Sequence, residues 1–135
     1  MANVLVVDDS PTARALARRA LNGAGHEVTA LSCFVELAAT LAKVRPDAVV
    51  LDLNLPAMSG EALGEFLRRY QQQQIPIVIF SGESPARLEA AAAHLGAAAY
   101  VCKASDDVAG ELTRAVSTAL AIGAVNSTRD ATRPV

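Results

Sequence analysis

The sequence predicts a single α/β domain built on a doubly wound parallel β-sheet, and three observations lead to this fold class. The chain has 135 residues, of which 52% are hydrophobic, which is enough to bury a substantial core. Five short apolar runs alternate with segments of helical periodicity. Most of these runs are continuously apolar, as in strands that are covered on both faces. We therefore expect right-handed β-α-β crossovers, with five strands and five helices.

The strands are predicted from the apolar runs, three of which are rich in Val and Ile. In chain order they are "NVLVV" (3–7), "EVTAL" (27–31), "DAVVLDL" (47–53), "IPIVIF" (75–80) and "AAAYVC" (97–102).

The first and fourth helices are predicted to begin at Ser-Pro pairs. Ser10 and Ser84 suit the N-cap position, because a serine oxygen accepts a hydrogen bond from a free backbone N–H in the first turn. Pro11 and Pro85 then occupy the first helical position. Glycines in "NGAGH" and at Gly96 indicate where these helices end.

The other three helices are predicted from apolar stripes, the last of them after an acidic start. The stripes are Phe34, Leu37, Ala38, Leu41 and Val44, ended by Pro46; Leu63, Phe66, Leu67 and Tyr70; and Val108, Leu112, Val116 and Leu120. After these elements the chain becomes polar and aperiodic. We therefore expect a domain over residues 1–122 and a flexible tail or truncated linker over 123–135.

Composition excludes several function classes. The net charge is −2 and no basic stripe stands out, so we expect no direct nucleic-acid binding and no membrane binding. Cys33 and Cys102 do not make a disulfide framework or a metal motif, and we interpret them as reduced thiols of a cytoplasmic protein. The N-terminus does not resemble a signal peptide. No run reaches the roughly 18 apolar residues that a membrane span needs.

Polar and charged residues follow four of the five predicted strands. Carboxyl ends of parallel strands meet at one sheet edge, where open α/β sheets bind their ligands. The residues at these ends are Asp8 and Asp9, Asp52, Ser81 and Gly82, and Lys103.

Three carboxylates, one ammonium and one hydroxyl predict a particular chemistry. Carboxylates crowded together repel one another and need a cation. Hard oxygen ligands with room for water suit Mg²⁺. A metal ion and an ammonium beside a carboxylate suit a phosphoryl group carried on that carboxylate, because phosphoryl transfer needs mainly positioning and charge neutralisation.

At this point the chain resembles a response-regulator receiver domain of two-component signalling. The resemblance is carried by "VVDDS", "LDLNLPAMSG", "FSG" and "YVCK", in this order, and it covers roughly residues 3–120. It implies a flavodoxin-like sheet with strand order 2-1-3-4-5. It also implies a signalling domain that catalyses its own phosphorylation and dephosphorylation, rather than an enzyme with a separate substrate.

The resemblance implies an acceptor and a metal site. Asp52 would be the phosphoacceptor. Mg²⁺ would be bound by the side chains of Asp9 and Asp52, by Asp8 through a metal-bound water, and by the backbone carbonyl of Asn54.

The resemblance also implies roles around the phosphoryl group. Lys103, Ser81 and Gly82 would contact it, and Tyr100 would be the switch aromatic, coupled to the Ser81 hydroxyl. Asn54 and Glu83 would tune the rate of dephosphorylation.

The implied donor is a histidine kinase or a phosphotransfer protein, or a small acyl phosphate. Phosphorylation would change the face formed by the fourth helix, fifth strand and fifth helix, and so control an unknown output protein or domain. Ala99 stands where dimerising members usually have an acidic residue, which favours a monomer or weak dimer. One alternative is a receiver fragment of a longer regulator or hybrid kinase. A distant one is a small Mg²⁺-dependent hydrolase with an aspartyl nucleophile, which the adjacent Asp8 and Asp9 disfavour, since such enzymes carry D-x-D.

Two positions depart from the family pattern. Lys103 is followed by Ala104, where the family has proline after a cis bond. A cis bond before a residue other than proline costs about 3–4 kcal/mol, so we expect either a trans bond with an altered loop or a cis bond held at that cost. Ser81 stands where threonine is commoner; it keeps the hydroxyl and loses a methyl, which predicts a looser switch.

Overall fold

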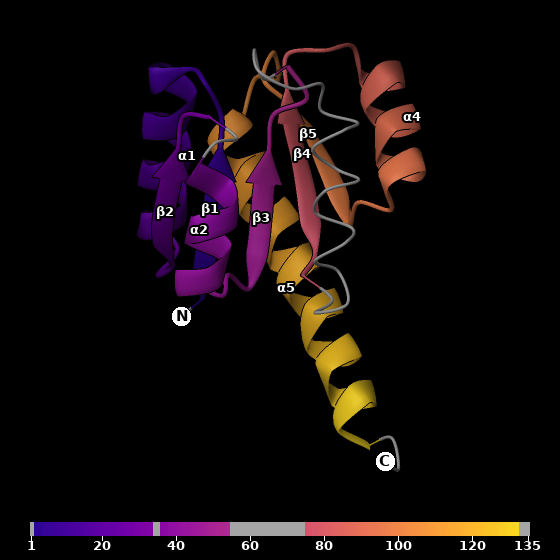
Figure 1. The fold of residues 1–135 in the computed structure, drawn as a ribbon. Coiled ribbons are helices and arrows are strands. Elements are labelled where there is room, and N and C mark those ends of the chain that lie inside the picture. The colour runs from indigo at the N-terminus through magenta and orange to yellow at the C-terminus, as the bar shows by residue number, and fades with distance from the viewer. Residues whose placement is uncertain (1, 34–35, 55–74, 133–135) are drawn as a thin grey trace.

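The structure of the chain is a computed structural model that describes residues 2–33, 36–54 and 75–132 (Figure 1). Strands and helices alternate along these residues. In order they are β1 (Asn3–Val7), α1 (Pro11–Gly23), β2 (Glu27–Leu31), α2 (Leu37–Lys43), β3 (Ala48–Leu51), β4 (Ile77–Ser81), α4 (Pro85–Leu95), β5 (Ala99–Cys102) and α5 (Val108–Thr132).

The five strands form one parallel sheet in the order β2-β1-β3-β4-β5, which confirms the predicted fold class and strand order. The registers keep the strand ends level: Val7 of β1 is aligned with Leu31 of β2 and with Leu51 of β3. At the other side of the sheet, Ser81 is aligned with Cys102. All five carboxyl ends therefore lie at one edge, at the top of Figure 1.

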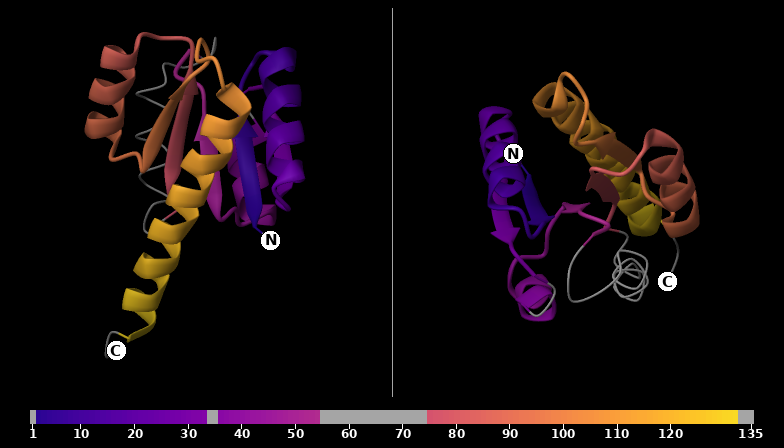
Figure 2. Two further views of the ribbon diagram at one scale, coloured as in Figure 1. Left: turned by 180° about the vertical axis from the view of Figure 1, so that it is seen from behind. Right: turned by 90° about the horizontal axis from the view of Figure 1, so that it is seen from above.

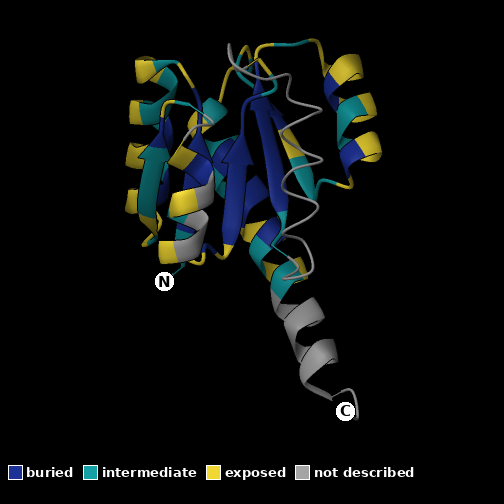
Figure 3. Ribbon diagram, in the orientation of Figure 1, coloured by how far each residue is buried: buried dark blue, intermediate teal, exposed yellow. Residues whose placement is uncertain are grey.

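Burial of the strands follows their position in the sheet (Figure 3). Every residue of β3 and β4 is buried, and so are four of the five residues of β1. Edge strands β2 and β5 are only partly covered. The continuously apolar runs are thus explained by helices on both faces of the central strands.

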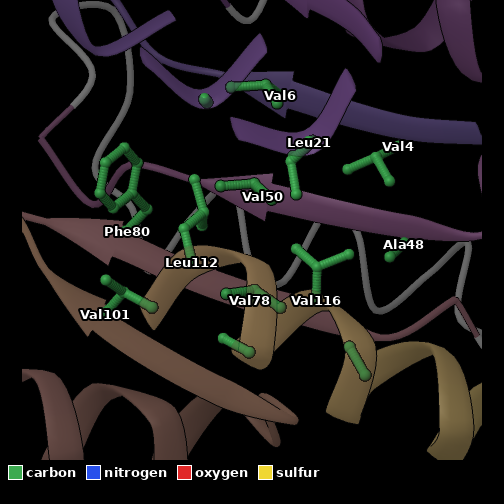
Figure 4. Close-up of a cluster of buried hydrophobic side chains, with 13 residues drawn as sticks. Val4, Val6, Leu21, Ala48, Val50, Val78, Phe80, Val101, Leu112 and Val116 are labelled. Atoms are coloured by element: carbon green, nitrogen blue, oxygen red, sulfur yellow. The ribbon is translucent and has the colours of Figure 1, made fainter. Parts of the chain in front are cut away.

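Helices α1 and α5 cover one face of the sheet, and α2 and α4 cover the other (Figure 2). The larger core lies beneath α1 and α5, where Leu21, Leu112 and Val116 pack on side chains that alternate along the strands (Figure 4). On the opposite face, Leu37 of α2 packs against β1 and β3, and Leu88 of α4 packs against Ile79 of β4.

The predicted helix ends are confirmed for α1 and α4. The Ser10 side chain accepts a hydrogen bond from the Ala13 amide at 3.2 Å, and Ser84 accepts one from the Arg87 amide at 3.4 Å. α4 ends at Gly96, whose φ of 68° lies in the left-handed region that glycine adopts without strain.

Part of the sequence prediction falls outside the described residues. The third predicted helix, with Leu63, Phe66, Leu67 and Tyr70, lies there, and so do Phe34 and the side chains of Ala38 and Leu41. Within the described part, α2 is shorter than its predicted stripe, and Leu37 is its fully buried residue.

A helix covers part of the predicted tail or linker. The domain boundary at residue 122 stays a prediction, but α5 continues as a helix to Thr132 and extends past the sheet (Figures 1 and 2). Residues 121–132 include alanines and no proline, and the single Gly123 is tolerated within α5; the first proline after this stretch is Pro134. At Gly123 an added Cβ would lie 3.4 Å from the Pro76 ring, so α5 passes close to the amino-terminal end of β4 at this point.

Other sequence expectations concern covalent and membrane features. Cys33 and Cys102 are free thiols, as expected. The described residues contain no cis peptide bond, so Lys103 and Ala104 are joined by a trans bond. None of the helices in the described part of the chain combines the length and apolarity needed to span a bilayer.

Candidate functional site

Three aspartates meet where β1 and β3 end. Asp8 follows β1 directly and Asp52 follows β3 directly, and these two strands are neighbours in the sheet. One carboxylate oxygen from each of Asp8, Asp9 and Asp52 lies within 4.8 Å of the others. Asp8 and Asp52 are buried, with 1% and 4% of their surface exposed, whereas Asp9 is exposed. The cluster is therefore open to solvent on the Asp9 side.

Lys103 brings a positive charge to this cluster from the end of β5. Its Nζ lies 2.8 Å from Asp8 Oδ2 and 3.3 Å from Asp52 Oδ2. Its position is fixed at both ends: its amide donates to the Ser81 carbonyl at 2.8 Å, and its ammonium lies 5.3 Å from the centre of the Phe80 ring. That separation suits a cation–π contact. The ammonium thus neutralises part of the acidic charge.

Backbone hydrogen bonds hold the two buried aspartates in place. The Asp8 amide donates to the Leu31 carbonyl and the Asp52 amide to the Val7 carbonyl, both at 3.0 Å, which extends the sheet pairing by one residue. The side chains also accept from nearby amides: Asp8 Oδ1 from Ser10 at 2.9 Å, and Asp52 Oδ1 from Asn54 at 3.1 Å. Both carboxylates are therefore oriented before any ligand binds.

Burial and charge act in opposite directions on the Asp8 carboxyl. Burial raises the pKa of Asp8 above its ordinary value, and the Lys103 ammonium and the Ser10 amide only partly offset this. For Lys103, burial by itself lowers the pKa, but the carboxylates of Asp8 and Asp52 outweigh it, so the pKa stands above its ordinary value. Lys103 is thus charged at neutral pH, beside an aspartate whose ionised form is disfavoured by the fold.

The raised pKa of Asp8 predicts a pH dependence of stability. The folded chain binds the Asp8 proton more tightly than the unfolded chain, whose pKa is 3.8, so stability falls as pH rises from that value through the raised folded pKa. Asp8→Asn removes this effect. In urea unfolding with EDTA, the stability of the variant relative to wild type should increase from about pH 4 to pH 7. A difference that stays constant or shrinks would contradict the assignment.

The donor set fits a hard divalent cation such as Mg²⁺. All three side chains offer carboxylate oxygens, and the exposed side leaves room for the waters that Mg²⁺ retains. A second observation supports the fit. The buried Asp8 Oδ2 pairs with the Lys103 ammonium at 2.8 Å and accepts no other hydrogen bond from the described residues. Asp8 therefore keeps acceptor capacity facing the cluster.

A polar group lies beside the acidic cluster at the end of β4. The buried Ser81 hydroxyl accepts a hydrogen bond from Asn54 Nδ2 at 3.3 Å and a long one from the Glu83 amide at 3.5 Å. Glu83 forms an ion pair with Arg87 at 3.3 Å, and Gly82 is exposed in the same loop. The predicted phosphoryl-contacting and dephosphorylation-tuning residues are thus in contact with one another.

Tyr100 lies on the outer side of β5 and is 40% exposed. It borders a groove of about 620 Å³ between α4, β5 and α5, which Pro85, Cys102 and Arg114 also line. Two strand positions separate Tyr100 from Cys102, the residue aligned with Ser81. Tyr100 therefore lies at the α4-β5-α5 groove, and its role as a switch residue stays a prediction.

Sequence reasoning missed three supporting residues. Phe80 lies beneath the Lys103 ammonium, and strand parity could have revealed it, because Phe80 is aligned with Val101, two residues before Lys103. The Arg14 guanidinium donates to the Asp8 carbonyl at 2.8 Å, and Cys102 Sγ donates to the Glu83 carbonyl at 3.4 Å. Neither of these contacts has a sequence signature, because each depends on a backbone carbonyl.

Several curated relatives of the chain are transcriptional regulatory proteins. Over 100 residues the chain is 33% identical to the transcriptional regulatory protein PrrA of Mycobacterium tuberculosis, and it is 34% identical to the KDP operon transcriptional regulatory protein KdpE of Escherichia coli. These matches cover 74% and 76% of this chain but only 42% and 45% of the relatives. The chain thus spans less than half the length of these curated relatives.

Solved structures show the same fold. The chemotaxis response regulator CheY4 of Vibrio cholerae superposes with a TM-score of 0.78 at 28% identity, covering 89% of this chain and 99% of CheY4. NtrX from Brucella abortus gives a TM-score of 0.87 at 26% identity, covering 99% of this chain and 30% of NtrX. The sequence also matches the family described as the response regulator receiver domain over residues 4–117. The fold, the acidic edge and these matches agree: the chain belongs to the response regulator receiver domain family.

Proposed function

We propose that the chain accepts a phosphoryl group on Asp52 in a Mg²⁺-dependent reaction, from a phosphohistidine of a histidine kinase or phosphotransfer protein. One observation carries the proposal. The Asp52 carboxylate lies at the end of the central strand β3, 3.3 Å from the Lys103 ammonium and within 4.8 Å of two further carboxylates suited to a divalent cation. A carboxylate with an ammonium and a cation site beside it suits phosphoryl transfer.

The transfer step follows from these neighbours. An Asp52 carboxylate oxygen attacks phosphorus, the phosphorus–nitrogen bond of the donor breaks, and the imidazole leaves as a neutral ring after taking a proton from solvent. The Asn54 amide holds Asp52 Oδ1, and Lys103 offers its ammonium to the negative charge of the phosphoryl oxygens. Bound Mg²⁺ supplies further neutralisation of that charge.

We further propose that Asn54 and Glu83 set how quickly the acyl phosphate hydrolyses. Asn54 contacts the Ser81 hydroxyl and follows Asp52 by two residues, and the Glu83 amide also contacts Ser81 while its carboxylate pairs with Arg87. Hydrolysis by water would return the Asp52 carboxylate and release phosphate. This assignment makes the chain a signalling domain that catalyses its own phosphorylation and dephosphorylation.

Intact mass spectrometry tests the proposed reaction. With acetyl phosphate and Mg²⁺, the wild-type chain should gain about 80 Da, the mass of one phosphoryl group. The gain should disappear when EDTA replaces Mg²⁺, because the cation neutralises charge that Lys103 alone does not. A gain that is insensitive to EDTA would contradict the metal requirement. Absence of the gain under both conditions, together with absence of beryllofluoride binding, would contradict the acceptor role.

We also propose that phosphorylation draws Ser81 and Tyr100 inward and so changes the α4-β5-α5 face that binds the output partner. Tyr100 fluorescence tests this in a Tyr70→Phe background, since the chain has two tyrosines and no tryptophan. Beryllofluoride with Mg²⁺ should reduce acrylamide quenching of Tyr100, because its side chain moves from 40% exposure into the domain. Adding Ser81→Ala should abolish the change. If beryllofluoride binds to the protein that retains Ser81 but acrylamide quenching of Tyr100 does not change, the proposed switch is contradicted.

The partners follow from the family. Response regulator receiver domains interact with kinases and with output domains. Because the curated relatives are longer than this chain, we propose that the α4-β5-α5 face controls an output domain, carried either on the same polypeptide or on a separate protein. A cytoplasmic location, a monomer or weak dimer, and absence of direct nucleic-acid contact by these residues are parts of the same proposal.

A further inference from the structure

Each polar group of Asp8 has a partner, and one of these partners, Arg14, has no role in the proposed reaction. Its amide donates to the Leu31 carbonyl, Oδ1 accepts from the Ser10 amide, and Oδ2 faces Lys103. The remaining group is the Asp8 carbonyl, which accepts a hydrogen bond from Arg14 Nη1 at 2.8 Å. Arg14 is half-buried in the first turn of α1. Because the donor is a charged guanidinium, this short hydrogen bond is stronger than one between two neutral groups.

The Asp8 carbonyl belongs to the peptide unit that leads into Asp9. Because a peptide unit is planar, a hydrogen bond that fixes its oxygen also fixes the orientation of the next amide and Cα. Asp9 needs such support, since its exposed carboxylate accepts no hydrogen bond from any residue that the structure describes. The backbone position therefore limits how far the Asp9 carboxylate can lie from the other two, which are now within 4.8 Å.

We propose that Arg14 is a positioning residue for the magnesium site: its hydrogen bond to the Asp8 carbonyl holds the peptide that presents Asp9 to the cation. The inference rests on the proposed Mg²⁺-dependent function. Arg14 acts on this site through the backbone carbonyl of Asp8 rather than through a carboxylate.

Two effects of Arg14 on cation affinity have opposite signs. Its positive charge repels a divalent cation, so removing the charge strengthens binding if charge dominates. Loss of the hydrogen bond frees the Asp9 peptide, so the same change weakens binding if positioning dominates. Residues that orient metal ligands in this way typically change metal affinity by about 10–100-fold when they are replaced. We expect positioning to dominate, because the guanidinium is directed at the carbonyl and solvent screens its charge.

Isothermal titration of the whole chain with MgCl₂ alone tests the proposal. Arg14→Met keeps the apolar stem and removes the donors, and its Mg²⁺ dissociation constant should rise about 10-fold. Arg14→Lys keeps a charged donor and should remain within about threefold of wild type. The matched control is Arg18→Met, one turn further along the same helix and exposed, which should bind as wild type does.

Two further readouts separate positioning from a loss of structure. The melting midpoint in EDTA should be similar for Arg14→Met and Arg18→Met. The rate of phosphorylation by acetyl phosphate should recover to the wild-type value at saturating Mg²⁺, which a damaged fold would not allow. If Arg14→Met does not fold, Arg14→Gln takes its place, with at least about threefold weaker binding expected.

The outcomes distinguish this inference from the function on which it rests. If wild type binds Mg²⁺ and is phosphorylated, but the Arg14 variants bind Mg²⁺ as tightly as wild type or more tightly, the positioning role is overturned and the proposed function stands. If wild type itself does not bind Mg²⁺, the Mg²⁺-dependent function fails and the inference fails with it.

Discussion

Replacing Lys103 with methionine should lower the free energy of unfolding by about 3 kcal/mol in metal-free buffer at pH 7. The substitution keeps the length of the side chain but removes the ammonium that lies 2.8 Å from Asp8 and 3.3 Å from Asp52. Two buried carboxylates then face each other without a counter-charge. Breaking a buried ion pair in this way costs about 3–5 kcal/mol, and the 24% exposure of the Lys103 side chain places the effect near the lower limit.

Urea unfolding with EDTA measures this loss, and the chain supplies a matched control. Lys43, its only other lysine, is exposed in the last turn of α2, so Lys43→Met should change stability by less than about 0.5 kcal/mol. Mg²⁺ should restore part of the loss in Lys103→Met, because it neutralises the same carboxylates. Equal effects of the two substitutions would show that the ammonium does not balance the acidic cluster.

The contribution of Lys103 to the free energy of unfolding also has a defined pH range. Its folded pKa is raised above the ordinary value of 10.5, so the stabilisation is fully present below that value and is lost as pH rises through the folded pKa. The deficit of Lys103→Met relative to wild type is therefore expected to be undiminished at pH 8.

Asp52→Asn should abolish phosphorylation by acetyl phosphate completely. The amide retains the shape of the side chain, and its oxygen still accepts from the Asn54 amide, but it has no anionic oxygen to attack phosphorus. The mass gain of about 80 Da expected for wild type should be absent at every Mg²⁺ concentration. We expect neither Asp8 nor Asp9 to replace Asp52 as the acceptor.

Asp47→Asn is the matched control for this substitution. Asp47 immediately precedes β3, at the opposite end of the strand from Asp52, and its side chain accepts from the Asn3 amide at 2.8 Å, which an asparagine oxygen also does. The control should be phosphorylated as wild type is. A mass gain that persists in Asp52→Asn would assign the acceptor to another residue.

The fold was predictable because its elements carry local and independent patterns. β1 and β2 were predicted with the observed bounds, and the Ser-Pro starts of α1 and α4 were confirmed, since a cap and a fixed proline φ act within one turn. The end of α5 was not predicted. Its polar C-terminal residues show no apolar stripe, which is the signal used for the other helices, and no proline stops the helix before Pro134.

The candidate site was predictable in position but not in its detailed contacts. Adjacent parallel strands bring their ends to one edge, so Asp8 and Asp52 had to be neighbours once the strand order was known. That Lys103 lies closer to Asp8 than to Asp52, and that burial raises the pKa of Asp8, depends on side-chain positions that the sequence does not specify. The contacts of Arg14 and Cys102 involve carbonyl groups, which every residue possesses.

The two departures from the family pattern, at Ala104 and Ser81, do not displace the Lys103 ammonium or the Ser81 hydroxyl from the site. With a trans bond between Lys103 and Ala104, the ammonium still reaches both buried carboxylates. The Lys103 amide is paired with the Ser81 carbonyl, and its ammonium lies over the Phe80 ring. Ser81 keeps its hydroxyl in contact with Asn54. The direction of Lys103 therefore does not depend on a proline at the next position.

Locating the acceptor by borohydride trapping tests the central claim most directly. The wild-type chain is phosphorylated with acetyl phosphate and Mg²⁺ and reduced with borohydride, which converts an aspartyl phosphate to homoserine, and its peptides are then mapped by mass spectrometry. We expect homoserine at position 52 and at no other aspartate. Homoserine at Asp8 or Asp9, or a phosphoryl group that resists reduction because it lies on a hydroxyl or imidazole, would contradict it.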